Sequence, residues 1–193
     1  MLKKDIQTEQ QILALIEDDK WMMDVLRTAQ RLELSDWWIC AGFVRSKIWD
    51  TLHGYDRRTP LADIDVIYFD PHCLDEGEEK RLEQQLIAWK PGIPWSVKNQ
   101  ARMHKINNLP PYKSAEDGIA NFPETVTALG VKLGADGLIL TAPHGIEDVI
   151  QMQVRPVPVF VMSEELQDVY KNRMKSKDWK GNWPMVSVQH KFL

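Results

Sequence analysis

The region from residue 36 to residue 104 alternates strand-like and helix-like segments, and this order restricts the fold more than any other feature of the chain. Three runs rich in β-branched and aromatic residues, DWWICAGF, DIDVIYFD and PGIPWSVKN, are separated by segments with helical spacing at residues 44–54 and 74–89. Strands that alternate with helices are typical of a sheet that carries helices on its faces. The pattern predicts an α/β or α+β fold with a mixed β-sheet.

Helical spacing also marks both ends of the chain. Apolar residues recur at intervals of three and four before residue 34, which predicts two short amphipathic helices, and residues 163–177 predict a C-terminal helix. Between these ends we expect a short helix at 114–121, strands at 124–133 and 137–143, and a helical turn at 145–152. We expect one structural domain, in which residues 1–34 form an N-terminal helical segment packed on a core of residues 35–193.

Composition narrows the class of protein. The 193 residues are 44% hydrophobic and carry a formal net charge of −4, so nucleic acid has no general electrostatic attraction, although a local basic patch stays open. The two cysteines, Cys40 and Cys73, form no thiolate zinc motif. The first 19 residues contain scattered charges and no long apolar run. We therefore expect a cytoplasmic protein without a membrane partner.

The run DIDVIYFD begins with two carboxylates, Asp63 and Asp65. Side chains two apart on a strand point to the same face, so the two acids would project together while Ile64 and Val66 are buried. Such carboxylates repel each other unless a cation lies between them, and hard divalent ions such as Mg²⁺ or Mn²⁺ prefer oxygen ligands. The pair is a candidate metal site; taken alone, it is more commonly explained by solvation of the start of a strand.

Gly42 ends a strand-like run, and a helix-like segment follows at once. The backbone N–H groups and the positive end of a helix at such a turn attract phosphate, and Arg45 in the first turn would add a bidentate contact. A simple tight turn and a surface arginine would look the same in the sequence. A phosphate site and a carboxylate pair about twenty residues later are less common together than either feature alone.

Residues 98–104, KNQARMH, concentrate hydrogen-bond donors and cations. Lys98, Asn99 and Arg102 are candidate ligands for a triphosphate or an acceptor near a metal, and the alternative is a solvated strand-to-helix junction. The five histidines, including His104, lie apart in the sequence, so we expect no histidine metal cluster. Most of the eight tryptophans are expected to anchor the core.

Gly42 after a strand, followed by Asp63-Ile64-Asp65 on the next, resembles the DNA polymerase β-like nucleotidyltransferase superfamily. More specifically, the chain is similar to a bacterial nucleotidyltransferase-like family from about residue 37 onward. The runs that carry this resemblance are WWICAGFVRSKIWDTLHGY, LADIDVIYFD, WSVKNQARMH, FPETVTALGVKL, APHGIEDVIQMQVRP and DWKGNWP.

The resemblance implies a nucleotidyltransferase that moves a nucleoside monophosphate from a nucleoside triphosphate to an acceptor that the sequence does not identify. It places Gly42 and Arg45 at the phosphates, Asp63 and Asp65 on Mg²⁺ or Mn²⁺ as catalytic residues, and Lys98, Asn99 and Arg102 near the substrate. Arg155 belongs to the same resemblance, and a buried ion pair explains it about as well as substrate binding.

Two departures from the superfamily pattern favour an alternative. Phe43 follows Gly42 where a second small residue is usual, and the strand at 95–104 offers Asn99 and Gln100 where a third carboxylate is usual. An amide oxygen ligates Mg²⁺ but is no general base. The alternative is a catalytically impaired module that binds a nucleotide or a partner, unless an acid from elsewhere, such as Asp148, comes close.

Overall fold

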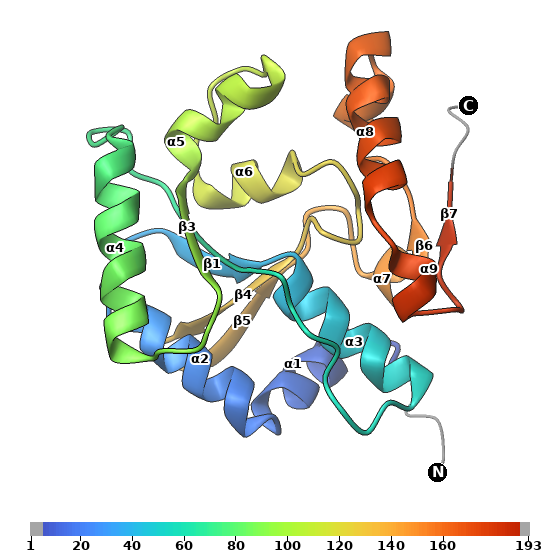
Figure 1. Ribbon diagram of the computed structural model, residues 1–193, viewed down its shortest axis with the longest axis horizontal. Helices are drawn as coiled ribbons and strands as arrows, with labels where there is room; N and C mark the ends of the chain where they lie inside the picture. Colours follow the sequence, from blue (N-terminus) through green and yellow to red (C-terminus); the bar gives the residue numbers. More distant parts are fainter. Residues whose placement is uncertain (1–5, 190–193) are drawn as a thin grey trace.

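A single mixed sheet of five strands organises the chain in the computed structural model, which describes residues 6–189 (Figure 1). The strand order is β3-β2-β1-β4-β5, and within this sheet β2 and β3 are parallel while the other neighbouring strands are antiparallel. Parallel neighbours need a crossover connection, which α4 supplies. The strands are β1 (Trp37–Cys40), β2 (Ile64–Tyr68), β3 (Trp95–Asn99), β4 (Gly130–Gly134) and β5 (Gly137–Thr141).

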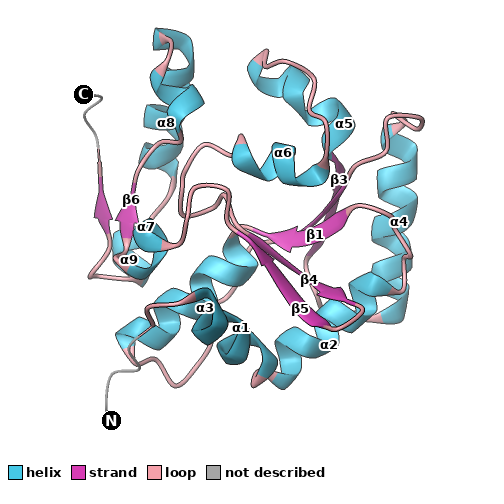
Figure 2. Ribbon diagram, turned by 180° about the vertical axis from the view of Figure 1, so that it is seen from behind, coloured by secondary structure: helices cyan, strands magenta, loops and turns pink. Residues whose placement is uncertain are grey.

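Helices cover both sides of this sheet. Helices α1 and α2 lie on one side and α6 lies on the other (Figures 1 and 2). Within residues 6–189, no helix combines the length and apolar character needed to cross a membrane. The helical elements are α1 (Glu9–Glu17), α2 (Lys20–Gln30), α3 (Gly42–His53), α4 (Glu76–Trp89), α5 (Gln100–Met103), η1 (His104–Asn107), α6 (Ala115–Ala120), α7 (Glu147–Ile150), η2 (Pro158–Val161), α8 (Glu164–Ser176) and α9 (Trp179–Asn182).

The two N-terminal helices are amphipathic and pack directly on this framework. Helix α1 contacts α3 and β5, and α2 contacts β4 and α4. Ile12, Ile16, Met22 and Leu26 are fully buried in the same hydrophobic cluster as the sheet residues. Side-chain oxygens cap both helices at their amino ends, which satisfies backbone N–H groups there.

The mixed sheet with flanking helices confirms the predicted fold class, but three element boundaries differ from the prediction. The strand expected to run to residue 104 ends at Asn99, and Gln100 is the first residue of α5, where the Asn99 side chain accepts a hydrogen bond from the backbone N–H of Ala101 and caps the helix. The first strand ends at Cys40, and Gly42 is already the first residue of α3. Only the end of the predicted strand at 124–133 is a strand, because Glu124 accepts backbone hydrogen bonds from Thr127 and Ala128 and so closes a turn. A buried acid that binds its own turn competes with strand pairing.

A cluster of tryptophans attaches the C-terminal segment to α3. The Trp49 ring meets Trp179 and Trp183 edge-on, with ring centroids 6.0 and 5.2 Å apart. The Trp183 indole N–H donates to Asp50 Oδ1 at 2.8 Å, and the same carboxylate accepts two bonds from Thr59. Asp50 therefore joins α3, the loop that leads to β2, and the C-terminal segment. Further along that segment, β7 (Ser187–Val188) pairs in parallel with the earlier strand β6 (Gln153–Val154).

Replacement of Trp183 by Phe should lower the free energy of unfolding by about 1–3 kcal/mol more than the same replacement at Trp179. Both rings are buried against Trp49, but within the described chain the Trp179 indole N–H has no hydrogen-bond partner. Urea unfolding of both variants measures the difference. Equal losses would show that ring packing, rather than the bond to Asp50, holds the segment.

Candidate functional site

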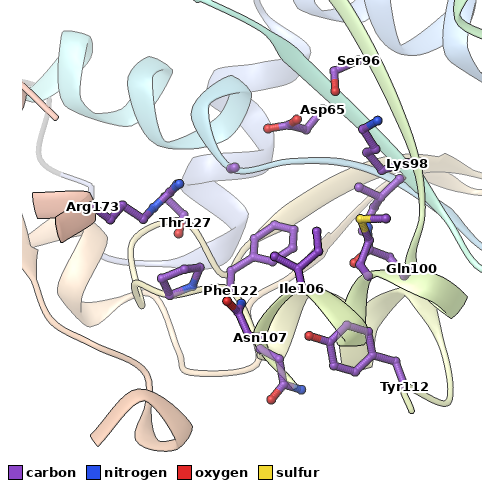
Figure 3. A pocket seen from close by; sticks show the side chains of 15 residues that line it. Asp65, Ser96, Lys98, Gln100, Ile106, Asn107, Tyr112, Phe122, Thr127 and Arg173 are labelled. Carbon is purple, nitrogen blue, oxygen red and sulfur yellow. The ribbon is translucent and has the colours of Figure 1, made fainter. Parts of the chain in front are cut away.

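A cavity of about 350 Å³ lies over the face of the sheet formed by β2 and β3 (Figure 3). Asp65 and Ile67 of β2 and Ser96 and Lys98 of β3 form one wall. The opposite walls come from α5, η1, the segment after α6, and α8. The residues that line those walls, together with Ala41 at the amino end of α3, are Gln100, Met103, Ile106, Asn107, Tyr112, Asn121, Phe122, Pro123, Thr127 and Arg173.

The two predicted metal ligands lie at the start of β2. Asp63 immediately precedes the strand and is exposed, whereas Asp65 is half-buried and pairs in register with Ser96 of β3. Burial and the charge of Asp63 raise the pKa of Asp65 to about 6, although the Ser96 hydroxyl, Arg173 and Lys177 act in the opposite direction. A cation bound beside Asp65 would therefore stabilise its ionised carboxylate.

The amino end of α3 opens beside this pair. Ala41 has φ 54° and ψ −117°, a backbone conformation that alanine rarely adopts, so the sharp turn falls on Ala41 and not on Gly42. No side chain caps the helix. A Cβ at position 42 would meet only ordinary contacts, 3.6 Å from Arg45 Nη2 and 3.9 Å from Leu61 Cδ2. The protein's own packing therefore does not require glycine there.

Arg45 is buried in the tryptophan cluster rather than on the surface. Its guanidinium lies 5.1, 5.2 and 5.6 Å from the ring centroids of Trp49, Trp179 and Trp183. Its Nε has no hydrogen-bond partner within the described chain, and Nη2 reaches Ser46 Oγ at 3.4 Å. Burial lowers the pKa of Arg45 to about 10, so the side chain stays cationic at neutral pH beside Gly42.

The three residues predicted near the substrate from 98 to 102 separate in space. Arg102 forms a bidentate ion pair with the buried Glu79, at 2.6 Å for each nitrogen, and does not line the cavity. The Asn99 side chain binds backbone groups of Asp70, Cys73 and Ala101. Lys98 lines the cavity, with its Nζ 3.5 Å from Glu79 Oε2.

Arg173 of α8 is a cationic residue of the cavity that the sequence analysis missed. Its Nε donates to Glu124, a fully buried carboxylate that also accepts from Thr127 Oγ1 at 2.7 Å. A signal was present, because Arg173 lies between Tyr170 and Met174 on the face that α8 buries. An arginine in that position needs an acid inside the protein, and Glu124 lies within the apolar run FPETVTAL.

In the described part of the chain, no third carboxylate joins Asp63 and Asp65 in a metal-binding group. Within residues 6–189, no group of three or more His, Cys, Asp or Glu side chains is placed to hold a metal ion. The strand neighbour of Asp65 is Ser96, a neutral residue. Asp148 instead accepts from Thr125 Oγ1 at 2.8 Å and lies 3.4 Å from Arg155 Nη1.

The geometry therefore combines a carboxylate pair, an uncapped helix end and two arginines at one end of a cavity. Oxygen ligands for a hard cation lie beside groups that attract an anion. Such a site suits a phosphate ester that carries its own divalent cation. The arrangement has cationic groups in place for a developing negative charge, but among residues 6–189 no third carboxylate lies with the pair to act as a general base.

Comparisons with known proteins agree with this arrangement. The sequence profile of the nucleotidyltransferase family matches residues 27–188. A solved NMR structure described as revealing a CCA-adding enzyme head domain is similar, with a TM-score of 0.86 and 33% identity over 96% of this chain and 98% of that one. No curated protein matches the sequence.

Two solved structures of CCA-adding enzyme share the fold at lower similarity. An apo form gives a TM-score of 0.57 at 15% identity, and a complex with CTP gives 0.58 at 11%. This chain covers only 42% and 44% of their lengths. The family profile matches most of the chain, and the sheet brings the start of β2 to the amino end of α3. The chain therefore belongs to the nucleotidyltransferase family.

Proposed function

We propose that the protein transfers a nucleoside monophosphate from a nucleoside triphosphate to an acceptor, with Mg²⁺ or Mn²⁺ bound by Asp63 and Asp65. The observation that carries this proposal is the pairing of Cys40 with Asp65, which brings the uncapped amino end of α3 to the carboxylate pair. In the reaction, an acceptor oxygen forms a bond to the α-phosphorus, and the bond to the leaving pyrophosphate breaks.

The residues present fit a cation that arrives with the nucleotide. Two carboxylates and the Ser96 hydroxyl are hard oxygen ligands, and Mg²⁺ commonly takes one or two carboxylates and completes its shell with phosphate oxygens and water. When bound, the cation would polarise the phosphoryl oxygens and neutralise their charge. Two carboxylates without a third acid support a site that is completed by the substrate.

Three features of the chain favour binding of the triphosphate beside this pair. The first backbone N–H groups of α3 have no side-chain cap, and the bare Cα of Gly42 lets an anion approach them closely. Arg45 supplies a buried positive charge next to Gly42. Arg173 supplies a second charge from the cavity wall, held in place by Glu124. Together these groups stabilise charge on the leaving pyrophosphate.

One observation favours a second function, a module that binds a nucleotide without turnover. The described residues place no third acid at the pair, so no side chain there is suited to activate an acceptor hydroxyl as a base. Phosphoryl transfer depends largely on positioning and charge stabilisation, which keeps transfer the leading proposal. Nucleotide binding without pyrophosphate release for a broad set of acceptors would favour the binding module.

Replacement of Asp65 by Asn should abolish Mg²⁺-dependent binding of nucleoside triphosphates, because it removes the carboxylate nearest the cavity wall. Isothermal titration of each of the four triphosphates, with and without Mg²⁺, measures this. Asp136→Asn in the exposed turn between β4 and β5 is the matched control and should bind as the native protein does. Undiminished Mg²⁺-dependent binding by the Asp65 variant would refute the assignment.

Replacement of Gly42 by Ala should separate nucleotide binding from stability. A Cβ would lie between Arg45 and Leu61, where we place a phosphate, and should weaken Mg²⁺-tripolyphosphate binding by about tenfold or more. The free energy of unfolding should stay equal or rise by up to about 1 kcal/mol, since alanine favours a helix. Gly54→Ala should show the reverse, because Gly54 has φ 69°. Native affinity in the Gly42 variant would contradict the proposed phosphate position.

Apo Asp65→Asn should be more stable than the native protein at pH 7.5 and equally stable near pH 4. The folded-state pKa of Asp65 is raised from 3.8 to about 6, so folding takes up a proton between these values and stability falls as the pH rises through them. The asparagine side chain of the variant does not ionise, so the variant avoids this fall in the free energy of unfolding, which reaches about 3 kcal/mol above pH 6. Urea unfolding across this pH range in a chelator tests it; a difference independent of pH would disprove the effect.

A further inference from the structure

We propose that the inner end of the cavity binds a planar heterocycle that presents a hydrogen-bond donor beside an acceptor, as a nucleobase does, and that Gln100 recognises this edge. The inference rests on the proposed function, because that reaction would supply the nucleotide or acceptor that carries the ring. It extends that function by assigning a specificity residue and a ligand class to the part of the cavity beyond Asp65 (Figure 3).

The Gln100 side chain is largely buried but has no hydrogen-bond partner among the described residues. Its residue is 2% exposed, it lines the cavity, and its amide makes no hydrogen bond to any residue from 6 to 189. The neighbouring Asn99 is equally buried, yet its side chain makes four hydrogen bonds to backbone groups. The amide is not fully enclosed by protein atoms: it opens onto the cavity, where a ligand or water can satisfy its hydrogen bonds.

Helix α6 is shaped around this amide. A Cβ at Gly118 would lie 2.6 Å from Gln100 Oε1 and 2.8 Å from its Cγ, so any other residue would displace the Gln100 side chain. Glycine inside a helix costs about 1 kcal/mol relative to alanine. Gly118 has no positive φ that would explain its presence, which leaves the close approach to Gln100 as its structural role.

The surrounding walls suit a flat, uncharged ring. Tyr112, Phe122 and Ile106 contribute apolar surface around the amide. Asn107 lies at the same end of the cavity, and Asn121 donates to Asp117 O, which leaves its own carbonyl oxygen for a ligand. Apolar walls with a few amide groups are characteristic of small-molecule pockets, and a side-chain amide offers a donor and an acceptor to a base edge.

Charge divides the cavity into two ends. The charged residues that line it, Asp65, Lys98 and Arg173, belong to β2, β3 and α8. The residues of α5, η1 and the segment around Tyr112 that line the cavity are uncharged. A ligand with phosphates at the first end and a neutral ring at the second matches this division. The ring belongs to the donor nucleotide or to the acceptor, since both must lie close to the α-phosphorus.

The test compares Gln100→Leu with Gln84→Leu, an exposed glutamine on α4. Isothermal titration measures binding of Mg²⁺-tripolyphosphate, the four nucleoside triphosphates, and the four nucleosides with and without Mg²⁺-tripolyphosphate. We expect Gln100→Leu to weaken binding of at least one nucleotide or nucleoside by about tenfold. Its affinity for tripolyphosphate should stay within about twofold of native, and Gln84→Leu should change nothing.

The pattern of losses identifies the source of the ring. A loss confined to one nucleoside triphosphate assigns the end of the cavity to the donor base, and a loss confined to a nucleoside assigns it to the acceptor. Gly118→Ala provides a second variant and should reproduce the same loss by displacing Gln100.

Two results would overturn the proposal. The first is that the Gln100→Leu variant binds every ligand with native affinity. The second is that, in the native protein, no nucleoside or nucleotide both binds more tightly than tripolyphosphate and shifts the NMR signals of the Gln100 side chain. Failure of tripolyphosphate to bind the native protein would count against the proposed function instead. Nucleoside binding without it is measured separately, so the two failures are distinguishable.

Discussion

The antiparallel pairing of β1 with β2 is the constraint on which the candidate site depends. Cys40, the last residue of β1, lies opposite Asp65, so the chain turns into α3 directly beside the carboxylate pair. The turn is sharp enough to force Ala41 to φ 54°. Because β3 runs parallel to β2 on its other side, Ser96 and Lys98 extend the same face. One register thereby places a helix end, two acids and a cavity wall together.

The C-terminal segment completes this arrangement through charge and aromatic packing. Arg45 is surrounded by Trp49, Trp179 and Trp183, and the last two come from α9 and the residue that follows it. Cation–π contacts compensate in part for removing a guanidinium from water. Arg173 of α8 meets Glu124 in a similar way. Segments more than one hundred residues apart in the chain therefore set the electrostatics around Asp65.

Asn99 and Gln100 show how adjacent residues of similar chemistry take different structural roles. The Asn99 side chain turns toward backbone groups at the end of β2 and the start of α5, which it satisfies. The Gln100 side chain lines the cavity and has no hydrogen-bond partner within residues 6–189. Asn99 ends β3 and caps α5, whereas Gln100 is the first residue of α5, so the two side chains leave the backbone in different directions. From composition alone the two amides were interchangeable.

The sequence by itself determined the order of helices and strands from residue 36 to residue 99, because hydrophobic periodicity is a local property that survives in the folded chain. It also determined that two acids lie two residues apart at a strand start and that a glycine lies where the first strand turns into the following helix. It did not reveal that residues 124–129 form a turn, since the bonds of Glu124 to Thr127, Ala128 and Arg173 join a local motif to a distant helix.

Only the tertiary structure decided which charges and amides share the cavity. Arg102 and Lys98 are four residues apart in the sequence, yet Glu79 holds one outside the cavity while the other lines it. Arg173 and Gln100 enter the site from segments that sequence spacing cannot relate. The physical reason is that side-chain partnership depends on sheet register and helix packing, which arise from contacts between distant parts of the chain.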